Sequence, residues 1–319
     1  MRAETKGARD RFRSRGFAVA WPRAGVRVQR AWVIGYLFIS PLLLFFLVYH
    51  VYPILRAFQM SFTNFKYLAP ANTHFVGLDN YIEALQDKYV LHGMLVAAQY
   101  LLMYIPLVMV LSIGVALILD RVSNQLLGGL YRTIYYLPVI MPPVVVYVLW
   151  KWMYTPSIGL INYLLVDTFH LLADRPQWLA SPSTALAAIV FMEVWRYLGY
   201  NVLLLLVGLG SINRELYEAA RIDGANEWQL IWHITLPLLK PTLLVIMVLK
   251  MRIFSIVEPM LVAPGVGDST WTWAYYAYNV AFVEGTLRMG YASAVGHLGA
   301  LVMGVLVYLQ YRVLRHERA

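Results

Sequence analysis

Long apolar stretches dominate this 319-residue sequence and leave few folds open to it. A helix that crosses a lipid bilayer needs about 20 mostly apolar residues. Six stretches meet that requirement, near residues 32–52, 94–119, 134–153, 184–209, 242–263 and 291–311. Only 13% of the residues are charged, against about a quarter in an ordinary soluble domain. The sequence therefore predicts an all-α, polytopic membrane protein with six transmembrane helices.

The basic residues are distributed unevenly over the connections between these stretches. An even number of spans places both termini on one side, and seventeen of the 26 lysines and arginines fall in segments on that side. Basic residues are retained on the cytoplasmic side during insertion, so we expect both termini in the cytoplasm and the chain in the cell (inner or plasma) membrane. The net charge of +9 follows from this topology, and no nucleic-acid partner is expected.

Two parts of different composition follow from this distribution. Residues 1–30 are rich in arginine and are predicted to form a basic cytoplasmic tail that lies against anionic membrane lipid. Residues 31–319 are predicted to form the six-helix transmembrane domain.

Several kinds of chemistry have no candidate residues in this chain. It contains no cysteine, which excludes disulfides, thiolate metal sites and cysteine nucleophiles. The seven histidines are scattered, so we expect no metal site. No paired carboxylates or nucleophile motif suggest a catalytic residue, and no Gly-x-x-x-x-Gly-Lys-Ser/Thr segment could hold a nucleotide phosphate. We therefore expect a chain that is no enzyme and binds no cofactor itself.

The connection between the fourth and fifth spans, residues 211–240, carries the most specific pattern. Asn213 and Asn226 are suited to cap two short helices, and Gly224 is suited to end the first. The second helix is expected to run until Pro237 removes a backbone donor. Taken by themselves, these features fit either a docking element for a cytoplasmic partner or an amphipathic turn that lies on the lipid headgroups.

The residues of this connection favour the docking element, because they resemble the EAA loop of the inner-membrane permeases of ABC importers. The matching residues are Glu218, Ala219, Ala220, Asp223, Gly224, Ile234, Leu236 and Pro237. Residues 75–81, 159–162 and 290–294 are similar to segments of the carbohydrate (maltose-type) branch of that family. The resemblance extends from about Trp32 to the C-terminus. Two segments, residues 263–267 and 97–99, depart from the family pattern. Both lie near the substrate side, so they weaken the inference about the solute more than the inference about the energy source.

The resemblance implies the type I importer permease fold and a set of partners. In this family the EAA helix fits a cleft on an ATPase subunit, and an ATPase dimer binds the ATP and magnesium. Glu218 would pair with an arginine of the ATPase, and Ala219, Ala220 and Gly224 would form the closely packed surface. The other implied partners are a second, homologous permease, an extracytoplasmic solute-binding protein and a carbohydrate substrate.

Charged and aromatic residues inside the fourth and fifth spans are candidates for the solute path. They are Glu193, Arg196, Tyr197, Tyr200, Lys250, Arg252 and Glu258. A charge inside a membrane costs about 2.5–3.5 kcal/mol on insertion scales and normally faces a partner or a wet cavity. The resemblance places these residues along the solute path, but they could equally pair among themselves as structural bridges.

The sequence leaves more than one possibility open for the solute and for the energy source. Three bases against two acids would suit a phosphorylated polyol such as glycerol 3-phosphate as well as a sugar. A gradient-driven secondary carrier is the alternative from another class, and it would predict inverted repeats, which are not evident. The third span is interrupted by Pro138, Pro142 and Pro143. They could form a gate that faces the solute path, or a kink in a helix that only packs in the bundle.

Overall fold

The computed structural model describes residues 27–122, 124–250, 268–285 and 287–316. The contact pattern separates Met1–Arg56 from Ala57–Ala319. The described part of the first unit is one continuous helical run, formed by α1 (Arg27–Phe46), the π-helical η1 (Leu47–Val51) and the beginning of α2 (Tyr52–Ser61). Most of the basic tail lies outside the described residues.

The second unit is a helical bundle. Its elements are η2 (Pro70–Asn72), α3 (Asp79–Gln86), α4 (Lys88–Asp120), α5 (Gln125–Ile140), α6 (Pro143–Met153), α7 (Leu160–Asn162), η3 (Tyr163–Thr168), α8 (Ala185–Gly210), α9 (Arg214–Ile222), α10 (Glu227–Leu230), η4 (Ile231–Thr235), α11 (Leu236–Lys250), α13 (Trp273–Tyr278), η6 (Asn279–Val283) and α14 (Met289–His316). No β-strand occurs within these described ranges, which agrees with the predicted all-α class.

Within the described residues the span candidates number six, as predicted, when a bent helix pair is counted as one. Five single helices are long and apolar enough to cross a membrane: Trp32–Ser61, Lys88–Asp120, Ala185–Gly210, Glu227–Lys250 and Met289–Arg312. The sixth candidate is the pair formed by Leu126–Ile140 and Pro143–Met153, which bends by 97°. The predicted third span is therefore broken in two. Met141 and Pro142 adopt extended backbone between the halves, since a residue before proline is disfavoured in the helical region.

The fifth span differs from its prediction at the start. The helix was expected to stop at Pro237 and a new one to begin near Thr242, but helix continues from Glu227 to Lys250. The π-helical turn η4 ends at Thr235, two residues before Pro237, and its wider turn accommodates the missing proline donor. The Thr235 hydroxyl donates to the Leu230 carbonyl, 3.1 Å away, and occupies an acceptor inside this irregular turn. The second half of the predicted span lies outside the described residues.

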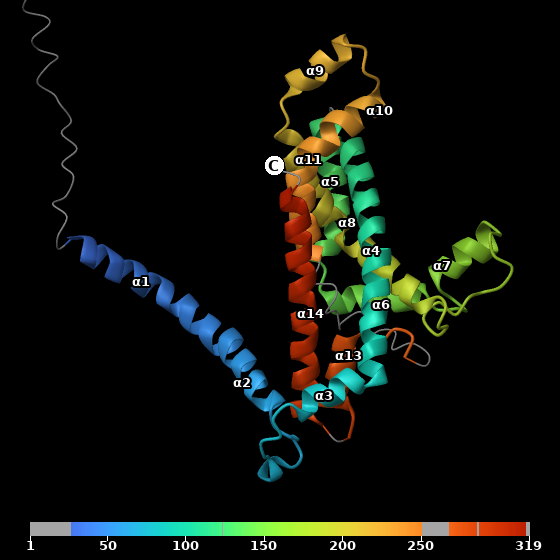
Figure 1. Ribbon diagram of the computed structural model, residues 1–319. Helices are drawn as coiled ribbons and strands as arrows, with labels where there is room; N and C mark the ends of the chain where they lie inside the picture. The colour runs from blue at the N-terminus through green and yellow to red at the C-terminus, as the bar shows by residue number, and fades with distance from the viewer. Residues whose placement is uncertain (1–26, 123, 251–267, 286, 317–319) are drawn as a thin grey trace, which may run out of the picture. The chain divides into compact units, whose positions relative to one another are not determined.

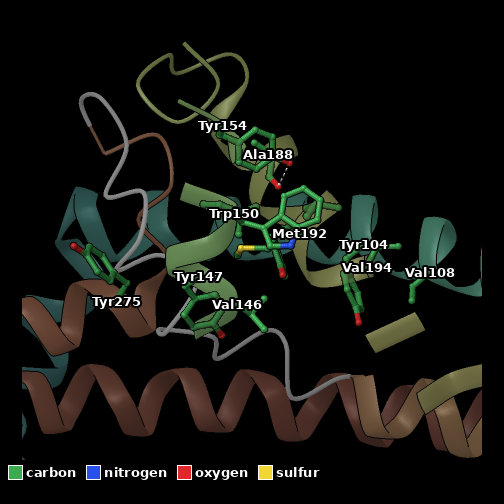
Figure 2. Packing of buried hydrophobic residues seen from close by; sticks show 13 residues of the cluster. Tyr104, Val108, Val146, Tyr147, Trp150, Tyr154, Ala188, Met192, Val194 and Tyr275 are labelled. Carbon is green, nitrogen blue, oxygen red and sulfur yellow. Dashed lines mark hydrogen bonds between the residues drawn. The ribbon is translucent and has the colours of Figure 1, made fainter. Parts of the chain in front are cut away.

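The core of the bundle is built around α8. This helix packs along α4 and also contacts α5 and α11. The largest buried cluster joins side chains of α4, α6 and α8 with Tyr275 of α13. Figure 2 shows the packing of this cluster, in which the Tyr154 hydroxyl donates to the Ala188 carbonyl at 3.0 Å. A second cluster, which includes Leu119, Leu205 and Leu239, joins α4, α8 and α11 nearer to α9.

Within the second unit, α9 and α10 lie at one end of the bundle and α3 lies at the other (Figure 1). At the α3 end, the Asp87 carboxylate accepts hydrogen bonds from the hydroxyls of Tyr276 (2.7 Å) and Tyr291 (2.6 Å). Burial opposes ionisation of Asp87, but the bonds from Tyr291, Tyr276 and the Tyr89 amide outweigh it and lower its pKa. Arg288 donates to both oxygens of Glu83. The bonds of Asp87 therefore tie the start of α4 to α13 and α14, and the bonds of Arg288 tie α3 to the segment just before α14.

Two of the segments that match the carbohydrate branch have a structural reason for their residues. The Asn80 amide donates to the carbonyls of Ser61 and Thr63, each at 2.8 Å. Gly290 lies so close to the Thr63 carbonyl that a β-carbon at this position would collide with it. The Gly290 amide donates to the Phe65 carbonyl at 3.0 Å. These residues therefore fix the segment after α2 against α3 and α14.

Candidate functional site

The loop between α8 and α11 has the two capped helices that the sequence predicts. The Asn213 side chain accepts a hydrogen bond from the Glu215 amide and begins α9. Gly224 ends it with φ of +85°, a left-handed conformation that glycine adopts without strain. Asn226 and Gln229 form a reciprocal capping box at the start of α10. Local signals therefore define both helix starts.

The residues that match the EAA motif are accessible within this chain. Glu218, Ala219, Asp223, Gly224 and Pro237 are exposed. Ala220, Ile234 and Leu236 are partly buried. α9 thus presents the Glu218 carboxylate beside the small side chains of Ala219 and Ala220, at one end of the bundle (Figure 1).

Contacts that the sequence analysis missed hold this surface to the bundle. The Glu227 carboxylate lies 2.6 Å from the Arg121 guanidinium, at the end of α4, and 3.3 Å from that of Arg221 in α9. The hydroxyls of Tyr217 and Thr235 are 3.0 Å apart and connect α9 to η4. The pairing of Arg121 with Glu227 could not be predicted from local sequence, because the two residues are 106 positions apart.

Tyr217 also packs against the buried cluster formed by α4, α8 and α11. Exposed ion pairs contribute only about 0–1 kcal/mol each, so the apolar contact of Tyr217 carries more of the stabilisation. Tyr217 and the two ion pairs of Glu227 thus connect α9 and α10 to the helices α4, α8 and α11.

A second group of predicted residues meets in the middle of the bundle. Glu193 is fully buried and Arg196 is 8% exposed. Their closest atoms, Oε1 and Nη1, are 3.4 Å apart. The same Nη1 donates to the Tyr147 hydroxyl at 2.8 Å, so α6 and α8 share this charge pair. Glu193 and Arg196 thus pair with each other, and this pairing leaves open whether they also border a solute path.

Lys250 joins the same neighbourhood from α11. Its side chain is buried, and Nζ lies 4.5 Å from the centre of the Tyr197 ring and 5.7 Å from that of Tyr200. The Arg196 guanidinium lies over the same Tyr197 ring, 4.8 Å from its centre. A cation over an aromatic face is attracted by the negative potential of the ring. The structure therefore brings together five of the seven predicted path residues, while Arg252 and Glu258 lie outside the described residues.

Two tyrosines that the sequence analysis did not single out belong to this neighbourhood. Tyr100 and Tyr104 are fully buried on α4, and their rings stack with centres 5.9 Å apart. Both hydroxyls lack a hydrogen-bond partner among the described residues. A four-residue spacing of tyrosines within the second span was the signal available in the sequence. Such hydroxyls are suited to bind water or a hydroxyl-bearing solute.

No metal centre can be assembled from the described ranges, since no three histidine, aspartate or glutamate side chains there converge as possible ligands.

The sequence matches the family model described as the binding-protein-dependent transport system inner membrane component over residues 109–317. The chain belongs to this family. The permease is 33% identical to the trehalose/maltose transport system permease protein MalF of Thermococcus litoralis, over 89% of this chain and 95% of that protein. It is also 33% identical to a probable ABC transporter permease protein of Pyrococcus horikoshii, over 88% and 96% of the two chains.

A solved structure shares the fold of the permease. The crystal structure of a bacterial ABC transporter that imports the acidic polysaccharide alginate contains a chain with a TM-score of 0.78 and 24% identity. The match covers 91% of this chain and 97% of that one. The predicted ABC importer permease fold and the predicted family are confirmed. The permease is thus a multi-pass membrane transport subunit.

Proposed function

We propose that the permease imports a sugar or oligosaccharide and that a separate ATPase drives it through the loop of residues 211–240. The accessible surface of α9, with Glu218 beside Ala219, is the observation that carries this proposal. Its connection to α4 through Glu227 and to η4 through Tyr217 supports a mechanical role. In this role Glu218 pairs with a basic residue of the ATPase, and Ala219, Ala220 and Gly224 allow close backbone approach.

The remaining partners follow from the same proposal. The chain has no phosphate-binding loop, so ATP and magnesium are bound by an ATPase dimer. A second, homologous permease completes the pathway, and an extracytoplasmic binding protein delivers the solute. α14 ends at the same end of the bundle as α9 and α10 (Figure 1), which supports a C-terminus on the ATPase side. The distribution of basic residues makes this side the cytoplasm.

The choice of a carbohydrate is supported by relatives and by side chains. One relative is named a trehalose/maltose permease, and a further solved structure shows an alginate transporter with an alginate pentasaccharide-bound periplasmic protein (25% identity, TM-score 0.75). Tyrosine rings can stack on sugar faces, and their hydroxyls can hydrogen-bond sugar hydroxyls. We propose that Glu193, Arg196, Tyr197, Tyr200 and Lys250 border the solute path, and the same role is proposed for Arg252 and Glu258. The relatives favour a sugar over a phosphorylated polyol.

A charge-removal experiment tests the ATPase-docking role. Glu218→Ala removes the proposed partner of an ATPase cation, and loss of one member of a buried pair costs about 2–5 kcal/mol. We expect the affinity for the ATPase, measured by co-purification and titration in detergent, to fall about 30-fold or more. Glu215→Ala is the matched control, because it removes an exposed acid from the first turn of the same helix.

Two results decide the proposal. Equal ATPase affinity for the Glu218 and Glu215 variants would contradict the assigned docking surface. Sugar uptake into proteoliposomes that continues without ATP, and stops when ion gradients are collapsed, would establish a gradient-driven carrier instead.

A further inference from the structure

The segment of residues 155–184, here called the arm, connects the end of α6 to the start of α8. Its helical part, α7 and η3, projects from the side of the bundle (Figure 1). Both flanking helices belong to membrane-span candidates, so the arm starts and ends at a membrane boundary. We infer that the arm is an interfacial anchor, with an apolar face inserted between membrane lipids and a polar edge in water.

The arm has a defined shape despite its small amount of regular structure. Asn162 is fully buried at its centre. The Asn162 amide donates to the carbonyls of Pro156 (3.2 Å) and Pro176 (3.1 Å), and its oxygen accepts a bond from the Trp178 indole at 2.7 Å. One side chain therefore joins the beginning, middle and end of the arm. Side chains on its surface are consequently held in place by this framework.

The surface that this framework supports is unusually apolar. Ile158, Phe169 and Leu171 are each more than 60% exposed, and Tyr163 is 56% exposed. Isolated exposed apolar residues are common, but a group of this size within one segment marks a contact with lipid or protein. Trp152, on α6 just before the arm, is 50% exposed and extends the apolar surface towards the span. Tryptophan at the end of a membrane helix is typical of the lipid–water interface.

The charges of the arm are compatible with a lipid environment. Arg175 binds both oxygens of Asp167, at 2.9 and 2.7 Å, and donates to the Ser157 carbonyl at 2.5 Å. The guanidinium is thus satisfied within the arm, which contains no lysine. In contrast, Asp174 is exposed on the arm. A segment that combines exposed apolar side chains with an internally paired guanidinium and an exposed acid is suited to lie in the lipid–water interface.

A lipid contact explains these features better than a protein contact. A protein interface of specific fit normally uses hydrogen bonds across its surface, whereas the Asn162 and Arg175 donors are used inside the arm. In addition, α6 leads directly into the arm, belongs to a membrane-span candidate and carries the exposed Trp152 near its end. The inference does not depend on which solute the permease carries.

The absence of cysteine from the chain makes a site-specific test direct. Phe169→Cys and Leu171→Cys would each be labelled with a nitroxide, in the permease purified with its associated subunits and placed in phosphatidylethanolamine–phosphatidylglycerol nanodiscs. Asp174→Cys, which replaces the exposed acid of the arm, is the matched control. We expect labels at positions 169 and 171 to collide several-fold more with oxygen, relative to a water-soluble nickel complex, than the label at position 174. Equal ratios at the three positions would overturn the inference.

A photo-crosslinking experiment distinguishes lipid from protein as the covering partner. A benzoylphenylalanine at position 169 would be irradiated in the same nanodiscs. A phospholipid adduct, identified by its mass on the intact chain, is the expected result. A covalent product with another polypeptide would assign the apolar face to a protein interface and overturn the inference. The same substitution at position 171 repeats the test if the variant at position 169 fails to assemble.

Discussion

The buried pair of Glu193 and Arg196 allows a quantitative test of the bundle interior. At their separation of 3.4 Å, two unit charges attract by about 5 kcal/mol at an effective dielectric constant of about 20. The desolvation of both ions offsets much of this attraction. Removal of one partner leaves the other charge buried, and such substitutions cost about 3–5 kcal/mol. We therefore expect Arg196→Met to lower the free energy of unfolding by that amount.

The measurement is chemical unfolding of the permease in mixed detergent micelles, followed by circular dichroism. Lys151→Met is the control, because Lys151 is an exposed cation on α6, the helix that also carries Tyr147. Surface substitutions of this kind usually change stability by less than about 0.5 kcal/mol. The double variant Glu193→Gln/Arg196→Met removes both charges and should recover most of the lost stability. A loss in Arg196→Met no larger than in Lys151→Met would refute the reasoning.

Transport by the double variant separates a structural role from a role in the solute path. If the pair only stabilises the contact of α6 with α8, recovered stability should bring recovered sugar uptake. If the pair borders the path, as proposed, uptake should stay impaired although stability returns. The comparison needs equal amounts of reconstituted protein, measured by quantitative blotting.

Three further predictions concern the two ends of the bundle. The lowered pKa of Asp87 stabilises the folded state at pH values above the unfolded pKa of about 3.9, and this stabilisation is lost as pH falls through the folded pKa. The melting temperature, measured between pH 3 and 7, should therefore fall more steeply towards acid pH for the wild type than for Asp87→Asn. Equal slopes for the two proteins would contradict this prediction. Gly290→Val should prevent assembly because its side chain meets the Thr63 carbonyl, whereas Gly285→Val, with open space around it, should assemble normally by size-exclusion chromatography. Asn226→Ala should destabilise α10 by about 1 kcal/mol and speed amide hydrogen exchange there, while Asn226→Ser should restore most protection.

The loop of residues 211–240 shows how much of a structure can be predicted from local sequence signals. The caps at Asn213 and Asn226 and the turn at Gly224 were predictable, because each depends on a side chain and the backbone within three residues of it. The continuation of α10 through Pro237 was not, since proline normally ends a helix and the compensating π-helical turn has no clear sequence signal. The ion pairs of Glu227 depend on where α4 ends in space, which no local pattern specifies.

Apolar stretches alone determined that this chain crosses a membrane about six times, because a helix in lipid must satisfy its own backbone hydrogen bonds and only composition decides which segments can do so. The motif of residues 218–237 determined the family in the same local manner. Only the tertiary structure decided which side chains surround each buried charge. The Arg196 guanidinium donates to the hydroxyl of Tyr147, 49 residues earlier in the chain, and the Lys250 ammonium lies over the Tyr197 ring. A buried charge is stabilised by neighbours that packing brings from other helices, so its partner cannot be read from the sequence around it.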